Sequence, residues 1–228
     1  MSGIPQGQVA VVTVATLKLW VLLCAVGLAG AQTTPPAVTE GDFIIRDFRL
    51  RSGGTLPELR MHYRTLGLPR EDAQGVIRNA ALILHGTGGS GAQFTGTAFA
   101  GELFGPGQPL DATKYYLIPD DLAHGGSSKP SNGLRTRFPR YAYADMVDAE
   151  YRLVVHGLRV NHLRLAIGTS MGGMHTWMWA ARYPDFADAW MPLASLPTQI
   201  SGRNRLRCAS RTGSAGDASD SSGVRSLR

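Results

Sequence analysis

Cysteine is scarce in this chain of 228 residues, which contains only Cys24 and Cys208. Cys24 lies inside an N-terminal apolar run, so the rest of the chain keeps one thiol near its end. One thiol cannot build a disulfide framework, even in an oxidising compartment. The fold must therefore be held by an apolar core, and the chain is long enough to bury a sizeable one in a single domain.

The chain also lacks the charge pattern of a nucleic-acid-binding protein. Its formal net charge is +6, but the six arginines and two aspartates after residue 200 contribute +4 of it. The remainder shows no basic helix and no alternation of aromatic with basic residues. We expect no nucleic-acid partner.

Nucleotide-binding motifs are absent or incomplete. The residues Gly86, Gly88 and Gly91 match the dinucleotide fingerprint, but that motif needs an acidic residue about 20 positions later, at the end of the next strand. The segment ELFGPGQPLD offers none that is well placed, and no Gly-Lys-Ser/Thr follows the glycines. The sequence therefore disfavours a Rossmann site and excludes a P-loop.

The first 31 residues have the features of a secretory signal peptide. Lys18 precedes the apolar run 19–28, and Ala29-Gly30-Ala31 follows, so we expect cleavage after Ala31. The alternative is an uncleaved membrane anchor, because residues 9–31 are almost long enough to span a bilayer, although Lys18 interrupts them. Cleavage predicts an exported protein, periplasmic or secreted, without stable membrane association.

Residues 41–205 have the pattern of an α/β domain, after a linker at 32–40 that contains QTTPPAVTE. FIIRDFRLRSGG and ELRMHYRTLG alternate apolar and polar positions around a Gly-Gly turn, which predicts an antiparallel hairpin at a sheet edge. Further strands are predicted in the segments NAALILHG, KYYLIPDD, HLRLAIGTS and AWMPLASLP. Helices are predicted in YADMVDAEYRLVVHGL and GGMHTWMWAARYP. Strands that alternate with helices indicate a mainly parallel sheet.

Residues 206–228 break this pattern. They contain no aromatic residue and no periodicity, and Ser, Gly and Arg dominate them. Such a segment cannot bury enough apolar surface to fold by itself. We expect a disordered tail, and the abrupt change of composition suggests that it is out of frame.

A serine in the middle of the domain has the setting of a catalytic nucleophile. Ser170 lies in Gly168-Thr169-Ser170-Met171-Gly172, between a predicted strand and a predicted helix. This context is typical of the nucleophile elbow, a strained turn that presents the hydroxyl at the top of a sheet. Side chains at Gly168 and Gly172 would collide with the neighbouring elements. The alternative is a glycine-rich turn with an idle serine.

The segment LILHGTGGSG agrees with this interpretation, because it ends a strand and continues as a glycine loop. In an elbow enzyme this loop supplies one oxyanion donor, and the residue after the nucleophile supplies the other. These donors would be the backbone N–H groups of Thr87 and Met171. Loss of one donor typically costs about 10²–10³ in rate.

No histidine in the chain is an obvious base for Ser170. His124 follows a strand, but we expect it to line the rim of the site rather than act as the base. His175 lies one turn after Ser170, and the helix axis should carry its side chain away from the hydroxyl. Other predicted packing or surface residues are His62, His156, His162, Trp177, Met178 and Trp179.

Together these segments resemble the α/β-hydrolase superfamily, and more narrowly its homoserine O-acetyltransferase-like branch. The resemblance is carried by LILHGTGGSGAQF, FAGELFGPGQPLD, GTSMGGMHTWMWAARYPDF and LASLPTQISGRNR. It implies a serine nucleophile, an acyl-enzyme, a small-molecule ester or acyl substrate, and water or an alcohol as acceptor. It implies no cofactor and no metal. The chain departs from the branch at Thr169 in the elbow and at His85-Gly86-Thr87-Gly88 in the loop.

In this superfamily an acid and then a histidine follow the nucleophile. No histidine follows His175 in this sequence, and neither Asp185 nor Asp188 is well placed to orient one. The pattern predicts a domain truncated after about the sixth strand and inactive as given. Two alternatives remain open: a non-catalytic protein that binds a ligand or partner, and a defective product. The sequence does not predict the oligomeric state.

Overall fold

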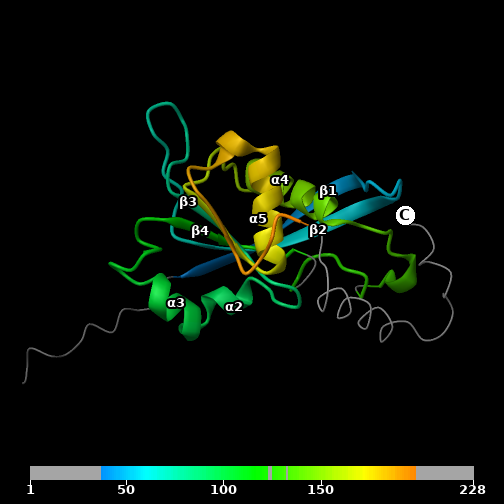
Figure 1. The fold of residues 1–228 in the computed structure, drawn as a ribbon, viewed down its shortest axis with the longest axis horizontal. Coiled ribbons are helices and arrows are strands. Elements are labelled where there is room, and N and C mark those ends of the chain that lie inside the picture. The colour runs from blue at the N-terminus through cyan, green and yellow to red at the C-terminus, as the bar shows by residue number, and fades with distance from the viewer. Residues whose placement is uncertain (1–36, 123–124, 132, 199–228) are drawn as a thin grey trace, which may run out of the picture. The chain divides into compact units, whose positions relative to one another are not determined.

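The computed structural model describes residues 37–122, 125–131 and 133–198. A six-stranded sheet runs through them in the order β1-β2-β4-β3-β5-β6 (Figure 1). The first two strands form an antiparallel hairpin, and β2 meets β4 antiparallel. The pairs β3–β4, β3–β5 and β5–β6 are parallel. The predicted hairpin and mainly parallel sheet are confirmed.

The strands are β1 (Val38–Arg49), β2 (Thr55–Leu66), β3 (Ala80–Leu84), β4 (Tyr116–Pro119), β5 (Leu165–Thr169) and β6 (Trp190–Leu193). All five residues of β3 and all four of β4 are buried. Continuous apolar runs suit these central strands because helices cover both faces of a parallel sheet. The hairpin strands instead alternate, since one face is solvated.

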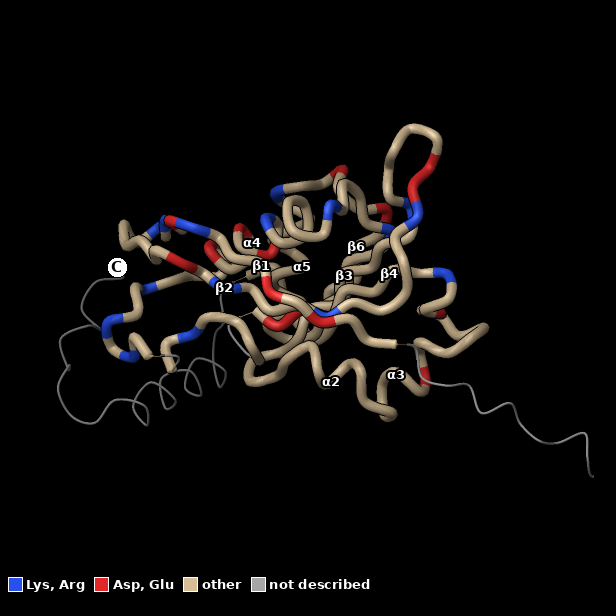
Figure 2. Tube along the Cα trace, turned by 180° about the vertical axis from the view of Figure 1, so that it is seen from behind, with Lys and Arg blue, Asp and Glu red and all other residues tan. Residues whose placement is uncertain are grey.

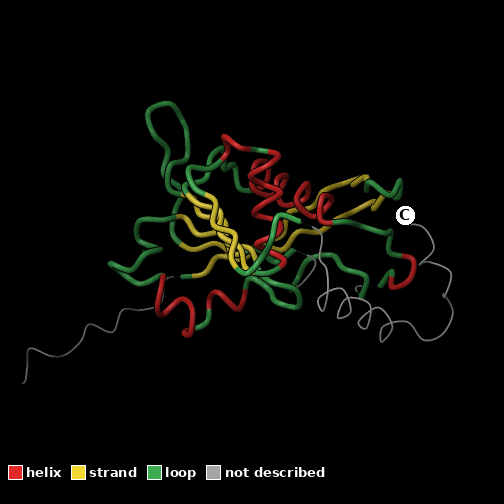
Figure 3. The backbone as a smooth tube through the Cα atoms, viewed as in Figure 1, coloured by secondary structure: helices red, strands yellow, loops and turns green. Residues whose placement is uncertain are grey.

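Helices lie on both faces of the sheet (Figure 3). The helices are α2 (Ala92–Thr95), α3 (Thr97–Leu103), α4 (Tyr143–Arg152) and α5 (Met171–Arg182). Side chains of α4 and α5 pack with β3 and β5 around the fully buried Trp179. Phe94 and Phe104, from the α2–α3 segment, pack on the opposite face. The glycine-rich segment between β3 and β4 therefore contains two short helices.

The predicted helix after residue 142 changes its winding before it ends. Residues Leu153–Gly157 form a π-helical turn, in which the N–H of Leu158 donates to the carbonyl of Leu153 over 2.8 Å. Gly157 packs so closely on the ring of Phe43 that a Cβ atom there would lie 3.0 Å from it. The turn thus brings the end of the helix onto β1, a contact that the helical pattern does not specify.

Several sequence predictions concern residues outside the described ranges. They are the signal peptide, the linker up to residue 36, His124 and the tail from residue 206. Among the helices that the structure does describe, none has the length and apolar character needed to cross a bilayer.

Candidate active site

Ser170 occupies the sharp turn between β5 and α5. Its backbone angles are φ 55° and ψ −114°, which side-chain-bearing residues rarely adopt. The chain holds this conformation from both sides, because the Ser170 N–H donates to the carbonyl of Leu193 over 2.9 Å and the Ser170 carbonyl accepts from Met174 over 3.1 Å. Strain maintained in this way is characteristic of functional sites, and the residue is exposed.

Two glycines make this turn possible. A Cβ atom at Gly168 would overlap the carbonyl oxygen of Gly172, and one at Gly172 would overlap the carbonyl oxygen of Leu84. The first contact packs β5 on α5, and the second packs α5 on the end of β3. The elbow therefore lies against the start of the glycine loop.

The glycine loop approaches Ser170 closely. A Cβ atom at Gly86 would lie 3.5 Å from Cβ of Ser170. A turn follows, in which the N–H of Gly89 donates to the Gly86 carbonyl over 2.9 Å and Gly88 adopts φ 82°. Thr87 is exposed in this turn, and neither its N–H nor that of Met171 donates to another described residue. Within the described ranges, both predicted donors thus make no hydrogen bond, and both lie on segments that adjoin Ser170.

The Ser170 hydroxyl makes no hydrogen bond with any described residue. The histidines with a side-chain partner in this part of the chain face other groups: His62 faces Asp42, His85 faces backbone carbonyls, His162 faces Asp188 and His175 faces Glu150. Within the described ranges, no group of three or more His, Cys, Asp or Glu residues is arranged to hold a metal ion.

Comparison with known proteins identifies this arrangement. A family model for the alpha/beta hydrolase fold matches residues 80–202, more than half of the chain. The chain belongs to the α/β hydrolase family. The match begins at β3 and includes both the glycine loop and the elbow.

Curated relatives of this α/β hydrolase have names of acyl-transfer enzymes. A probable acyltransferase of Methanothermobacter thermautotrophicus is 34% identical over 71% of this chain and 50% of its own length. A homoserine O-acetyltransferase of Chlorobaculum parvum is 35% identical over 71% of this chain and 44% of its own. The chain therefore spans about half the length of these relatives.

A solved structure agrees with these relatives. An acetylester hydrolase from Corynebacterium glutamicum superimposes with a TM-score of 0.57 at 26% identity, covering 66% of this chain and 43% of that one. The sequence resemblance and the fold class are both confirmed. The chain is thus similar both to acyltransferases and to an ester hydrolase.

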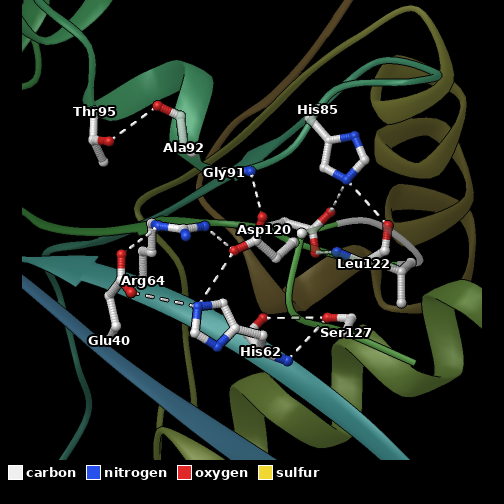
Figure 4. Close-up of polar contacts among 12 residues, drawn as sticks. Glu40, His62, Arg64, His85, Gly91, Ala92, Thr95, Asp120, Leu122 and Ser127 are labelled. Atoms are coloured by element: carbon white, nitrogen blue, oxygen red, sulfur yellow. Dashed lines mark hydrogen bonds and ion pairs between the residues drawn. The ribbon is translucent and has the colours of Figure 1, made fainter. Parts of the chain in front are cut away.

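A buried carboxylate that the sequence reading missed fixes the glycine loop of the α/β hydrolase. Asp121 is fully buried and accepts the N–H of Gly91 over 2.8 Å. Its other oxygen forms an ion pair with Arg64. Arg64 also donates to Glu40 over 2.7 Å (Figure 4). A Cβ atom at Gly91 would lie only 2.9 Å from the carbonyl oxygen of Asp120. Asp121 is thus a positioning residue for the loop that carries Thr87.

A second buried network holds the elbow helix. Glu150 of α4 faces α5, where one carboxylate oxygen lies 2.8 Å from Nδ1 of His175 and the other accepts the Trp179 indole N–H over 2.7 Å. All three residues are at most 1% exposed. Nε2 of His175 has no hydrogen-bond partner among the described residues. His175 thus faces Glu150, and this contact fastens α5 to α4.

Titratable groups beneath the elbow influence one another. Burial alone would lower the pKa of His175, but the charge and hydrogen bond of Glu150, with a contribution from Asp120, raise it overall. Burial, followed by repulsion from Glu150, raises the pKa of the Asp120 carboxyl to about 7. His85 partly offsets this rise in the pKa of Asp120, because its Nε2 lies 3.8 Å from Oδ2 of Asp120.

The sequence offers a weak signal for these networks. His175 and Trp179 are four residues apart on one helix, which places them on the same face. Nothing in the local sequence, however, pairs that face with Glu150, which lies 25 residues earlier.

Proposed function

We propose that Ser170 is the nucleophile of an acyl-transfer reaction on a small-molecule ester or acyl compound. The observation that carries this proposal is the strained backbone of an exposed serine whose following N–H group is free. In the first step, Oγ of Ser170 bonds to the acyl carbonyl carbon, the hydroxyl proton passes to a base, and the alcohol or thiol of the substrate leaves with a proton. The oxygen of water or an alcohol then bonds to the acyl carbon and loses its proton, the bond from that carbon to Oγ of Ser170 breaks, and Oγ regains a proton.

The N–H groups of Thr87 and Met171 would stabilise the negative charge that develops on the carbonyl oxygen in both steps. They belong to segments fixed by Asp121 and Glu150, so little reorganisation accompanies the reaction. Preorganised donors of this kind usually supply the largest part of the catalytic effect. The N-terminus of α5 adds a favourable dipole at the same place.

The base is not supplied by any histidine hydrogen-bonded to Ser170 in the described residues. We therefore expect the chain as given to acylate slowly and to release the acyl group even more slowly. An oxyanion hole and binding alone retain roughly 10³–10⁴-fold over the uncatalysed reaction. An acyl-enzyme should consequently accumulate.

The experiment is incubation with p-nitrophenyl acetate, followed by intact mass and peptide mapping. We expect one acetyl group on Ser170 in the parent chain and none at that position in Ser170→Ala. Ser131→Ala, which changes an exposed serine elsewhere, should behave like the parent. Acetylation that is equal in Ser170→Ala, or spread over surface residues, would overturn the assignment.

A non-catalytic binding protein is the second candidate. It is favoured by the isolation of the Ser170 hydroxyl, which has no hydrogen-bond partner among the described residues. On that hypothesis an unreactive amide analogue of the ester binds saturably to the parent and to Ser170→Ala alike, and no acetyl-serine forms.

A further inference from the structure

A hollow of about 280 Å³ lies at the opposite end of the parallel strands from Ser170. Its walls are Ala81, Pro109, Leu110, Tyr115, Arg164, Leu165, Asp188 and Ala189. These residues lie at or near the first residues of β3, β4, β5 and β6 and in the loop after α3. Leu165 begins β5 and Ser170 follows its end, which separates the two by about 16 Å along the strand. The hollow is therefore distinct from the proposed catalytic site.

Small side chains leave this hollow open. Ala81 and Leu165 are paired in the register of β3 with β5. On the other side of β5, the N–H of Ala166 donates to the carbonyl of Ala189 over 3.0 Å. Two alanines thus flank Leu165 on the neighbouring strands, and the half-buried side chain of Tyr115 adds an aromatic wall. The interior can therefore receive a compact apolar group.

An ion pair forms the charged part of the wall. Nη1 of Arg164 donates to Oδ2 of Asp188 over 2.9 Å, and Nε2 of His162 lies 2.8 Å from the other carboxylate oxygen. The hydrogen bonds with His162 and then with Arg164 lower the pKa of the Asp188 carboxyl, so it stays ionised and orients the guanidinium. The parallel strands β3 to β6 contain no charged residue themselves (Figure 2). The charges of the hollow therefore come from the residues that precede β5 and β6.

Most hydrogen-bond donors of Arg164 are unused. Of its five guanidinium N–H groups, one donates to Asp188, and the others have no acceptor among the described residues. The hydroxyl of Tyr115 also makes no hydrogen bond with any described residue. A carboxylate suits these donors, because the planar fork of arginine binds it through two parallel hydrogen bonds. The negative charge of Asp188 beside them disfavours a doubly charged ligand such as a phosphate ester.

We propose that this hollow binds a small monocarboxylate with one apolar ring, in which Arg164 and Tyr115 donate to the carboxylate and the space between Ala81 and Ala189 receives the ring. The volume lies just below the roughly 300 Å³ at which small-molecule sites usually begin, which restricts the ligand to a single ring. A flat ring also suits the aromatic wall that Tyr115 provides. The site goes beyond the proposed function, because binding requires no chemistry at Ser170.

Titration of the full chain with benzoate, followed by ligand-observed NMR, tests the proposal. The parent should bind benzoate saturably, and Arg164→Gln should bind it about fivefold more weakly, as expected for one exposed charge pair. The matched control Arg46→Gln changes another exposed, ion-paired arginine and should leave the affinity unchanged. Ser170→Ala should bind benzoate normally, and Arg164→Gln should still be acetylated at Ser170, which separates this site from the acyl-transfer proposal.

The apolar part of the site is tested by filling it. Ala189 is exposed at the rim, so Ala189→Leu should abolish benzoate binding without changing the charge or the melting temperature. Ala181→Leu, at an exposed position of α5, is the control and should bind like the parent. Tyr115→Phe removes only a hydroxyl and should weaken benzoate binding about threefold. Benzyl alcohol should bind more weakly than benzoate, and Arg164→Gln should not affect it.

Three results would overturn the proposal. One is the absence of saturable benzoate binding to the parent. A second is an affinity for benzoate that neither Arg164→Gln nor Ala189→Leu changes, which would place the ligand elsewhere on the protein. The third is loss of benzoate binding in Ser170→Ala, which would place the ligand at the elbow instead of in the hollow.

Discussion

Glu150 and Asp121 are buried carboxylates that each hold a segment next to Ser170, but their surroundings differ. Glu150 lies between two helices and accepts from His175 and Trp179, which are themselves sealed in the core. Asp121 accepts from a loop N–H and from Arg64, whose side chain is 13% exposed and has Glu40 as a second partner. Each carboxylate fixes one of the two segments that carry the proposed oxyanion donors.

The different surroundings of Glu150 and Asp121 predict how much stability is lost when each carboxylate is removed. When a buried charged pair loses one partner, the other remains in a low-dielectric site without compensation. His175 and Trp179 have no alternative acceptor among the described residues, whereas Arg64 keeps Glu40. Removal of Glu150, which holds the elbow helix, should therefore destabilise the protein more than removal of Asp121, which holds the glycine loop.

Glu150→Ala should have the largest effect. It leaves His175 and the indole N–H of Trp179 buried without an acceptor, which costs about 3–5 kcal/mol of unfolding free energy. Urea denaturation followed by tryptophan fluorescence measures this loss. Asp148→Ala on the same helix is the control, because its ion pairs with Arg51 and Arg182 are partly exposed and should contribute below about 1 kcal/mol. Equal losses of unfolding free energy in the two variants would contradict the proposed role of Glu150 in holding α5 to α4.

Asp121→Ala should be less costly, at about 1.5–3 kcal/mol, because it removes charge-assisted hydrogen bonds but leaves Arg64 paired. Its specific signature is faster hydrogen exchange at the Gly91 amide, while amides of α5 stay protected. Asp42→Ala, which also removes a carboxylate from this polar region but is 43% exposed, should change neither quantity. Loss of protection in α5 at the same rate would show that the two sides are one unit.

Stability should fall as the pH rises from 5 to 8, by on the order of 3 kcal/mol. The raised pKa of His175 contributes stability that is present below its unfolded value of 6.5 and is lost above its folded value. Asp120 has the same sign, since its folded state retains a proton up to about pH 7, whereas an unfolded aspartate loses it near 3.8. His175→Gln should flatten part of this slope. Stability that rises over the same interval would refute the assignment.

Gly88→Ala should have the smallest effect, about 1 kcal/mol of destabilisation, from placing a side chain at φ 82° where no atom obstructs it. Gly101→Ala, in α3 and also unobstructed, is the matched control and should stabilise by up to about 1 kcal/mol. Thermal unfolding of both variants gives the comparison. If both shift the melting temperature in the same direction, the positive φ is not what Gly88 supplies.

Local patterns in the sequence were sufficient for the fold class and for the position of the elbow. Alternation predicts the solvated hairpin, continuous apolar runs predict the buried strands, and the glycines around Ser170 predict a turn that only a strand-to-helix junction explains. These features depend on neighbours a few residues apart, so they can be read directly.

Tertiary structure alone decided what holds the two donors in place. Asp121, which follows β4, contacts Gly91 in the glycine loop and Arg64 in β2. Glu150 of α4 contacts His175 of α5. A buried carboxylate is stabilised by whichever donors the fold brings within hydrogen-bond distance, and such contacts between distant segments leave no periodic signal in the sequence.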